Sequence, residues 1–307
     1  MTWVGKTKGG VLGYKFFVLI LKTFGLGAAY WVLRPVVLYY FFFSKESTKA
    51  SYCFFREGLH YSRLKSILYV YRNYYIFGQT LIDKVAVMGG LSRKFSMEHD
   101  GQEYLREVAQ KKTGGIFISA HIGNYEMAGH LLKTINTKIN LVMYDGEQKK
   151  VKAFLAEVYD ESPVNIIAIK DGLSHIIEIN NALKREEIIC IHGDRYVDGN
   201  KVLKKKFLGR DAWFPVGPFL LVHKLKVPYS FVFAVKETNL HYHFFATEAK
   251  LSEGSIEDLI DTYIVEVEKM VKRYPEQWFN FFNFWKEPST PQDEKHSGNI
   301  LQPDRAA

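Results

Sequence analysis

Acidic residues are absent from the first 45 positions of this 307-residue chain. Residues 1–97 contain 14 lysines and arginines against three acids, a net charge of +11, while residues 98–307 contain 27 against 30, a net charge of −3. The same first third is the most apolar and aromatic part of the sequence. Basic charge beside aromatic surface suits an anionic membrane better than a nucleic-acid groove, although an ordinary solvated basic face is the alternative.

Cysteine is scarce, and several catalytic motifs are missing. Only Cys53 and Cys190 occur, which excludes a disulfide framework and indicates a reducing compartment. The chain has no G-x-S-x-G, H-E-x-x-H or C-x-x-C motif, and its "VGKTKGG" stretch lacks the upstream glycine of a P-loop. These absences argue against a serine hydrolase with a nucleophile elbow, a zinc protease, a dithiol redox protein and a P-loop nucleotidase.

No uninterrupted apolar run is long enough for a clean spanning helix. The stretch from Phe16 to Phe43 is strongly apolar, but Lys22 and Arg34-Pro35 interrupt it, and a spanning helix needs about 20 apolar residues. The pattern favours two kinked helices lying in the membrane interface, or one imperfect anchor. We therefore predict a membrane-associating helical region over residues 1–97, and a remaining domain that folds without residues 1–45.

Short apolar runs alternate with helical patterns after about Gly101, which predicts an α/β domain over residues 98–286. We expect a central, mostly parallel sheet flanked by helices. The expected strands are Gly115–Ala120, Asn140–Tyr144, Val164–Ile169, Ile188–His192 and Tyr229–Val235, with a late antiparallel strand in Leu240–Ala249. The expected helices are Glu103–Lys112, Ala153–Glu161, His175–Arg185 and Ile256–Tyr274. Residues 287–307 contain few apolar residues and are expected to form a disordered tail.

The stretch "SAHIGNYE" places an acid–base pair at a strand-to-helix corner. Gly123 permits a tight turn, Asn124 is a plausible N-cap, and Glu126 falls in the first helical turn. If His121 precedes the helix, Glu126 could accept a hydrogen bond from one imidazole nitrogen and leave the other free as a base. A capping carboxylate beside a structural histidine is the alternative, and spacing alone does not decide between them.

Four blocks then resemble one family. "HIGNYE" resembles the H-x4-D/E motif of the lysophospholipid acyltransferase superfamily, and its form is closest to the lipid A late-acyltransferase branch. "HGDRYVDG", the Phe-x-Gly and Pro-x-Gly-Pro elements within residues 204–228, and "RYPEQWFNFFNFW" resemble later blocks of that branch, in the same order. Together they cover about residues 110–285. The short, interrupted apolar stretch and the tyrosine in the first block depart from the family pattern.

The resemblance implies a glycerolipid-acyltransferase-like fold and transfer of a fatty acyl group from acyl carrier protein or coenzyme A to a hydroxyl or amine of a lipid acceptor. His121 would be the base and Glu126 would orient it. Substrate contacts would come from Asn124, Asp194, Arg195, Lys204, Lys205 and Lys206. No metal or other cofactor is implied. The partners would be the acyl donor, a lipid and the membrane surface, without nucleic acid, at the cytoplasmic face of a bacterial inner membrane.

Alternatives remain open at the level of the sequence. The acceptor could be a specialised metabolite such as an aryl polyene or an amino-acid lipid. A lipid or thioester hydrolase could use the same pair with water, and a non-catalytic membrane-binding or nucleic-acid-binding protein would share the basic charge. Asp194 and Arg195 could form a purely structural pair, and the three lysines could be a solvated face. His192 could support the site, whereas His241 and His243 have no cysteine or carboxylate at a metal-ligand spacing.

Overall fold

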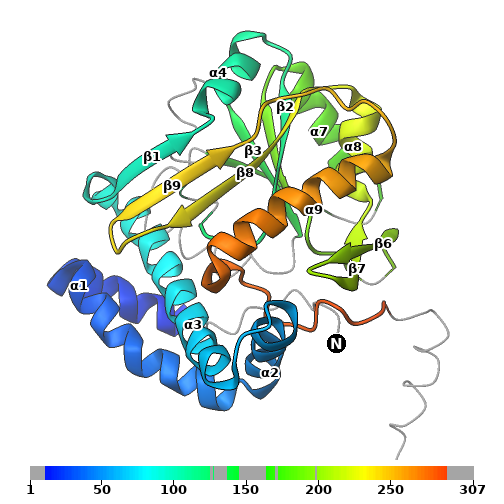
Figure 1. The fold of residues 1–307 in the computed structure, drawn as a ribbon. Coiled ribbons are helices and arrows are strands. Elements are labelled where there is room, and N and C mark those ends of the chain that lie inside the picture. Colours follow the sequence, from blue (N-terminus) through cyan, green and yellow to red (C-terminus); the bar gives the residue numbers. More distant parts are fainter. Residues whose placement is uncertain are drawn as a thin grey trace, which may run out of the picture.

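The computed structural model describes residues 11–124, 127, 137–144, 164–169, 172–197 and 199–288. Its centre is a seven-stranded sheet in the order β1-β9-β8-β2-β5-β3-β4 (Figure 1). The strands are β1 (Ser96–Asp100), β2 (Gly115–Ser119), β3 (Ile139–Tyr144), β4 (Val164–Ile169), β5 (Ile188–His192), β8 (Tyr229–Lys236) and β9 (His241–Ala246). A separate two-stranded hairpin consists of β6 (Val202–Phe207) and β7 (Arg210–Pro215).

The α/β prediction with a mostly parallel sheet is confirmed. β8, β2, β5, β3 and β4 run parallel to one another, while β9 is antiparallel to β8. Every residue of β2 is buried, as expected for a strand covered on both faces. Phe117 packs into the apolar cluster on one face, and Ile116 and Ile118 pack into the cluster on the other.

Helices cover both faces of the sheet. The helices of this part of the chain are α4 (Gln102–Gln110), α7 (Ser174–Lys184), α8 (Gly217–Leu225) and α9 (Ile256–Arg273). α4 contributes Leu105 and Val108 to the Phe117 cluster, while α7, α8 and α9 supply side chains to the opposite cluster. Three of the predicted helices are confirmed; the helix expected over 153–161 lies outside the described residues.

The sequence did not predict two strand regions, because neither has the apolar pattern of a buried strand. β1 is polar except for Met97, and in the described sheet it pairs with β9 at the edge. β6 carries three consecutive lysines, and its turn through Leu208 and Gly209, both with positive φ, closes a two-residue hairpin. Edge strands and hairpins of this kind are specified by pairing rather than by burial.

The N-terminal region consists of α1 (Val11–Phe43), α2 (Lys45–Cys53) and α3 (Arg63–Ala86), with a π-helical turn at Phe54–Gly58 (Figure 1). Gly25, at φ 81° and ψ −178°, divides α1 into two segments. Its second segment packs on α3, where a Cβ on Gly78 would lie 2.5 Å from Leu33 Cδ1. The break that divides α1 therefore lies at Gly25 rather than at Lys22 or Arg34-Pro35, and the choice between interfacial helices and one imperfect anchor stays a prediction.

α1 belongs to the main core. Leu26, Ala29, Leu33 and Val37 are each at most 6% exposed and join the same apolar cluster as the sheet. Removing residues 1–45 would expose the apolar face of α3, which opposes the expectation that the domain keeps its fold without them; that expectation stays a prediction. Among the described residues, Lys15–Phe43 is long and apolar enough to cross a membrane by length and composition, but Gly25 interrupts it.

Short helical turns follow α3 and α9. A π-helical turn at Val87–Leu91 and a 3₁₀ turn at Ser92–Lys94 connect α3 to β1. A second 3₁₀ turn, Pro275–Gln277, follows α9 and begins a C-terminal segment in which Trp278 forms a bridge with Ile122, just after β2.

Candidate active site

His121 and Asp194 lie together beyond the carboxyl ends of two adjacent parallel strands. In the register of β2 and β5, Ser119 lies opposite His192, so each of the two residues follows its strand by the same distance. The carboxyl ends of parallel strands are where α/β sheets bind ligands. Asp194 therefore shares this sheet edge with His121.

Asp194 is the carboxylate that holds His121. Its Oδ1 lies 2.7 Å from His121 Nδ1, and its Oδ2 accepts from the His121 backbone N–H at 2.9 Å and from Trp278 Nε1 at 3.4 Å. Burial raises the pKa of the Asp194 carboxyl, but His121 and Arg195 outweigh this effect and hold the pKa well below its usual value. Asp194 is therefore an anion throughout the physiological pH range.

The contact with Asp194 fixes the tautomer of His121. A carboxylate only accepts hydrogen bonds, so Nδ1 carries the proton and Nε2 carries the lone pair. Burial and the nearby charge of Arg195 lower the pKa of His121 below 6.5, while Asp194 opposes them. The side chain is 22% exposed, so the neutral imidazole can act as a base toward a bound substrate.

His192 packs against this pair. Its ring centroid lies 4.2 Å from that of His121. Burial and the adjacent His121 lower the pKa of His192 well below 6.5, so His192 is neutral at physiological pH. A second neutral ring beside His121 keeps water away from one side of the imidazole.

A metal ion could in principle use the same residues. Ligand atoms of His121, His192 and Asp194 lie within 4.8 Å of one another. However, two ligands of one zinc ion lie roughly 3.3 Å apart in a tetrahedral site with 2.0–2.1 Å bonds. The 2.7 Å separation between His121 Nδ1 and Asp194 Oδ1 is the distance of a hydrogen bond, so the geometry favours an acid–base pair.

The C-terminal segment supports the backbone of residues 121–123. Phe279 N–H donates to the His121 carbonyl at 2.8 Å, Gly123 N–H donates to the Gln277 carbonyl at 2.9 Å, and Ile122 forms a bridge with Trp278. Sequence reasoning assigned these residues no part in the site. The signal was present in the "RYPEQWF" block, whose position beside His121 only the tertiary structure reveals.

Gly123 is required where the stretch passes β8. It has φ 66°, and a Cβ there would lie 2.0 Å from the Ala234 carbonyl oxygen. We expect Gly123→Ala to destabilise the protein by more than about 2 kcal/mol, because backbone must move in addition to the strain at positive φ. The measurement is thermal or urea unfolding.

Gly199→Ala is the matched control for this prediction. Gly199 has φ 88° but open space around it, so its substitution should cost only the conformational strain of about 1–2 kcal/mol. Equal losses for the two variants would show that the close approach to Ala234 is unimportant.

Of three further predicted site residues, the structure describes Asn124 and Arg195 but not Glu126. Glu126 lies outside the described residues. Asn124 is buried; its Nδ2 donates to the Thr80 carbonyl and to Tyr242, and its Oδ1 accepts from the Met127 N–H. Arg195 donates to the Phe279 carbonyl and lies over the Phe282 ring. The roles predicted for all three residues stay predictions.

The three lysines lie on β6. Lys204 and Lys206 pair with Asp211 across the hairpin, at 3.1 and 2.6 Å, and Lys205 pairs with Asp261 of α9 at 2.7 Å. Lys204 and Lys206 are exposed and Lys205 is half-buried, and ion pairs near the surface contribute little to stability. Their predicted contact with a substrate or carrier protein stays a prediction.

The two histidines of β9 do have carboxylate neighbours, which the sequence did not indicate. His243 lies 3.2 Å from Glu237 and 3.1 Å from Asp100, and His241 lies 3.6 Å from Glu98. The pairing of β1 with β9 brings these distant residues together.

A buried carboxylate on one nitrogen of a histidine, at the carboxyl edge of a parallel sheet, is the arrangement of a general acid–base catalyst. The model of the bacterial lipid A biosynthesis acyltransferase family matches residues 72–287, so the chain belongs to that family and is an acyltransferase. The resemblance inferred from the four blocks is confirmed. A comparison with curated protein sequences found no match.

A solved structure is similar to this chain over most of its own length. It is the crystal structure of the 1-acyl-sn-glycerophosphate acyltransferase PlsC from Thermotoga maritima. The similarity covers 80% of this chain and 97% of that chain, with 15% sequence identity and a TM-score of 0.37.

Proposed function

We propose that this acyltransferase moves a fatty acyl group from a thioester, carried by acyl carrier protein or coenzyme A, to a hydroxyl or amine of a lipid A-like acceptor. The observation that carries the proposal is the 2.7 Å contact between His121 Nδ1 and Asp194 at the sheet edge, in a chain of this family. Asp194 takes the orienting role that the sequence assigned to Glu126.

The tautomer of His121 determines which of its nitrogens accepts the proton in the proposed reaction. His121 Nε2 accepts the proton of the acceptor hydroxyl as its oxygen attacks the thioester carbonyl, and Asp194 stabilises the resulting imidazolium. Collapse of the tetrahedral intermediate breaks the carbon–sulfur bond, and the departing thiolate takes the proton from His121. The groups that move protons are all side chains of this protein, and we propose that no metal takes part.

Arg195 and the β6 lysines are the proposed contacts for the substrates. Arg195 is the residue after Asp194, and its guanidinium charge lowers the pKa of His121. A phosphate bound to this guanidinium would therefore lie beside the reacting atoms. Lys204, Lys205 and Lys206 would exchange their carboxylate partners for an acidic carrier protein or lipid headgroups.

The exposed face of the N-terminal helices is the proposed membrane surface. Eleven of the 17 large apolar side chains that are exposed in the described residues belong to α1 and α3. One face of α1 packs on α3 while Trp31, Phe42 and Phe43 remain 65–71% exposed. An apolar face beside a basic region suits a helix that lies on an anionic cytoplasmic leaflet.

We expect Trp31→Ser, Phe42→Ser and Phe43→Ser, combined, to release the protein from membranes. Each buried aromatic side chain contributes about 1.5–3 kcal/mol, so each substitution should weaken partitioning by about tenfold or more. Flotation with phosphatidylglycerol vesicles measures the effect. Leu173→Ser with Ile177→Ser, which removes exposed apolar side chains elsewhere, should float like the unchanged protein; equal loss in both variants would refute a specific membrane face.

Mass spectrometry of cellular lipids, with and without the gene, tests the reaction itself. The proposal expects a lipid whose mass increases by one acyl chain, which names both the chain and the acceptor. The same increase in mass on a non-lipid metabolite would identify that metabolite as the acceptor in place of a lipid. Release of free fatty acid from acyl carrier protein or coenzyme A, without any acylated product, would identify a hydrolase and overturn it.

A further inference from the structure

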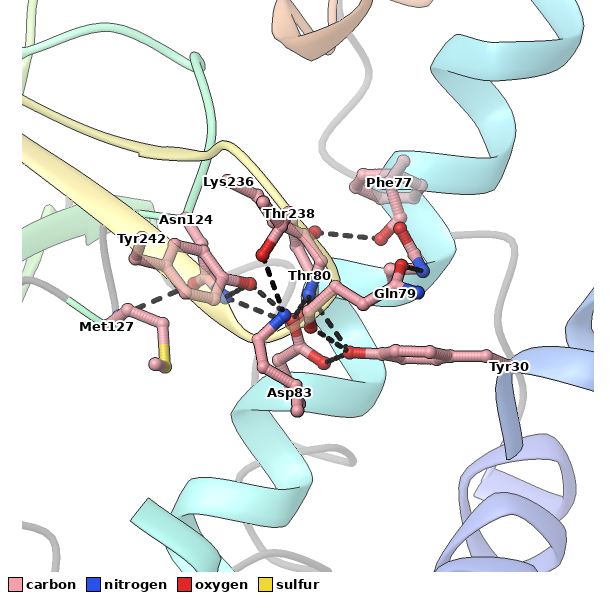
Figure 2. A network of polar contacts seen from close by, with 12 residues as sticks. Tyr30, Phe77, Gln79, Thr80, Asp83, Asn124, Met127, Lys236, Thr238 and Tyr242 are labelled. Atoms are coloured by element: carbon pink, nitrogen blue, oxygen red, sulfur yellow. Dashed lines mark hydrogen bonds and ion pairs between the residues drawn. The ribbon is translucent and has the colours of Figure 1, made fainter. Parts of the chain in front are cut away.

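A buried ionic cluster joins the N-terminal helices to the sheet, and nothing in the reaction uses it directly. We define the Asp83 cluster as Tyr30 of α1, Asp83 of α3, Lys236 at the end of β8, and Tyr242 of β9 (Figure 2). Asp83 is 0% exposed and Lys236 6% exposed. Four elements from distant parts of the sequence therefore meet at one charged pair.

The polar groups of the cluster satisfy one another. The Asp83 carboxylate accepts from Lys236 Nζ and from the hydroxyls of Tyr30 and Tyr242. Lys236 Nζ also donates to Tyr30 Oη at 2.9 Å and to the Asn239 carbonyl at 2.8 Å, so each of its three protons has an acceptor. Burial raises the pKa of Asp83 and lowers that of Lys236, and their pairing opposes both changes.

Stability alone is a weak reason for such a pair. Removing two charges from water costs several kcal/mol, and well-packed apolar side chains often replace a buried ion pair without loss of stability. What an ion pair with directed hydrogen bonds adds is a single arrangement of the elements that carry it. The question is which group needs that arrangement.

Two routes lead from the cluster to the catalytic stretch. Asn124 Nδ2 donates to Tyr242 Oη at 3.4 Å and to the Thr80 carbonyl of α3 at 3.1 Å (Figure 2). On the other side, the Gln277 side chain bonds both the N–H and the carbonyl of Lys236, at 2.8 and 2.7 Å, and the Gln277 carbonyl accepts from Gly123 N–H. Both routes end within three residues of His121.

We propose that the Asp83 cluster positions His121 and makes catalysis depend on the docking of α1. Tyr30 is the residue through which α1 enters the cluster, so it and Asp83, Lys236 and Tyr242 are positioning residues. The inference rests on the proposed role of His121 as the base. It extends that role by connecting the helix with the exposed apolar face to the geometry of the reacting imidazole.

Tyr30→Phe tests the proposal with the loss of a single oxygen. Tyr75→Phe is its matched control, because Tyr75 of α3 also reaches α1, donating to the Tyr30 carbonyl at 3.4 Å, without contacting Asp83 in any described hydrogen bond. Acyl transfer is measured with the thioester and lipid established for the unchanged protein. We expect kcat of Tyr30→Phe to fall on the order of 10- to 100-fold with little change in KM, the cost of a misplaced catalytic group, and Tyr75→Phe to retain kcat.

The pKa of His121 gives a readout that a merely structural role would not change. Looser packing would admit water, so we expect the imidazole pKa of Tyr30→Phe to rise toward 6.5, away from the lowering effects of burial and Arg195. Asp194, Arg195 and His192 are the titratable or charged groups that influence the ring in the described part of the chain. NMR of 13C-labelled histidine, assigned with His121→Ala, measures this pKa without any substrate.

The double variant Asp83→Leu with Lys236→Met removes the pair without leaving a lone charge. We expect it to fold, with the same loss of kcat and the same rise in the His121 pKa as Tyr30→Phe. If it does not fold, the comparison of Tyr30→Phe with Tyr75→Phe still decides. Equal kcat and equal His121 pKa in those two variants would overturn the coupling, whereas full transfer by His121→Ala would instead overturn the proposed function.

Discussion

His121→Ala is expected to lower acyl transfer by on the order of 10²- to 10⁴-fold, because a positioned base contributes that much to the rate. The substitution also leaves the buried Asp194 carboxylate without one of its hydrogen-bond donors. Leaving a buried acceptor with fewer partners costs about 1–3 kcal/mol of folding free energy, so a lower melting temperature is expected as well. The loss of transfer should far exceed the loss of folded protein.

Two further variants separate catalysis from stability. His121→Gln retains an N–H donor near Asp194 but has no basic nitrogen, so it should recover stability without recovering transfer. His60→Asn is the control, because His60 is exposed and has a positive φ that asparagine tolerates. A folded His121→Ala protein that transfers acyl groups at the rate of the unchanged protein would remove His121 from the mechanism.

Asp194→Asn is expected to reduce kcat by on the order of 10²- to 10⁴-fold while changing the shape of the site little. The amide cannot accept from both the imidazole Nδ1–H and the backbone as an anion does, and it no longer stabilises the imidazolium that forms when His121 takes a proton. The measurement is kcat and KM for the thioester, with circular dichroism to verify the fold.

The expected dependence of kcat/KM on pH has a definite direction. His121 must be neutral to accept a proton, so kcat/KM should be constant above its pKa and fall as the pH drops through that value, which lies below 6.5. Asp194 raises the pKa of His121, so its replacement by asparagine should move this acid limb to still lower pH.

Glu126→Gln, measured in the same assay, separates the two carboxylates. If Asp194 alone orients His121, Glu126→Gln retains most of the activity and leaves the acid limb in place. A severe loss in Glu126→Gln together with mild impairment in Asp194→Asn would restore the pairing that the spacing of "HIGNYE" suggested.

The local features of the chain were readable from the sequence because they depend on local physics. The apolar runs that became β2, β5 and β8 are buried for most of their length, so hydrophobicity alone marks them. The Ser255 capping box and the amphipathic pattern of α9 likewise follow from neighbouring residues. His121 could be chosen because it ends an apolar strand and lies within a block that resembles the family's motif.

The partners of His121 were decided by tertiary structure. Glu126 is five residues away in sequence and was the natural choice, yet the carboxylate at 2.7 Å in the described structure belongs to Asp194, which is 73 residues distant. Parallel pairing of β2 with β5 produces that contact, and strand order cannot be read from residue patterns.

The same holds for the N-terminal region. Its sequence determined that it would be helical, apolar, basic and interrupted, because composition and a glycine or proline break are local properties. Only the tertiary structure decided that one face of α1 would join the core on α3, and that Tyr30, Asp83, Lys236 and Tyr242 would meet in a buried cluster. Burial of a charged pair depends on which elements pack together, and packing joins residues that are distant in the sequence, as it does Tyr30 and Lys236, which are 206 positions apart.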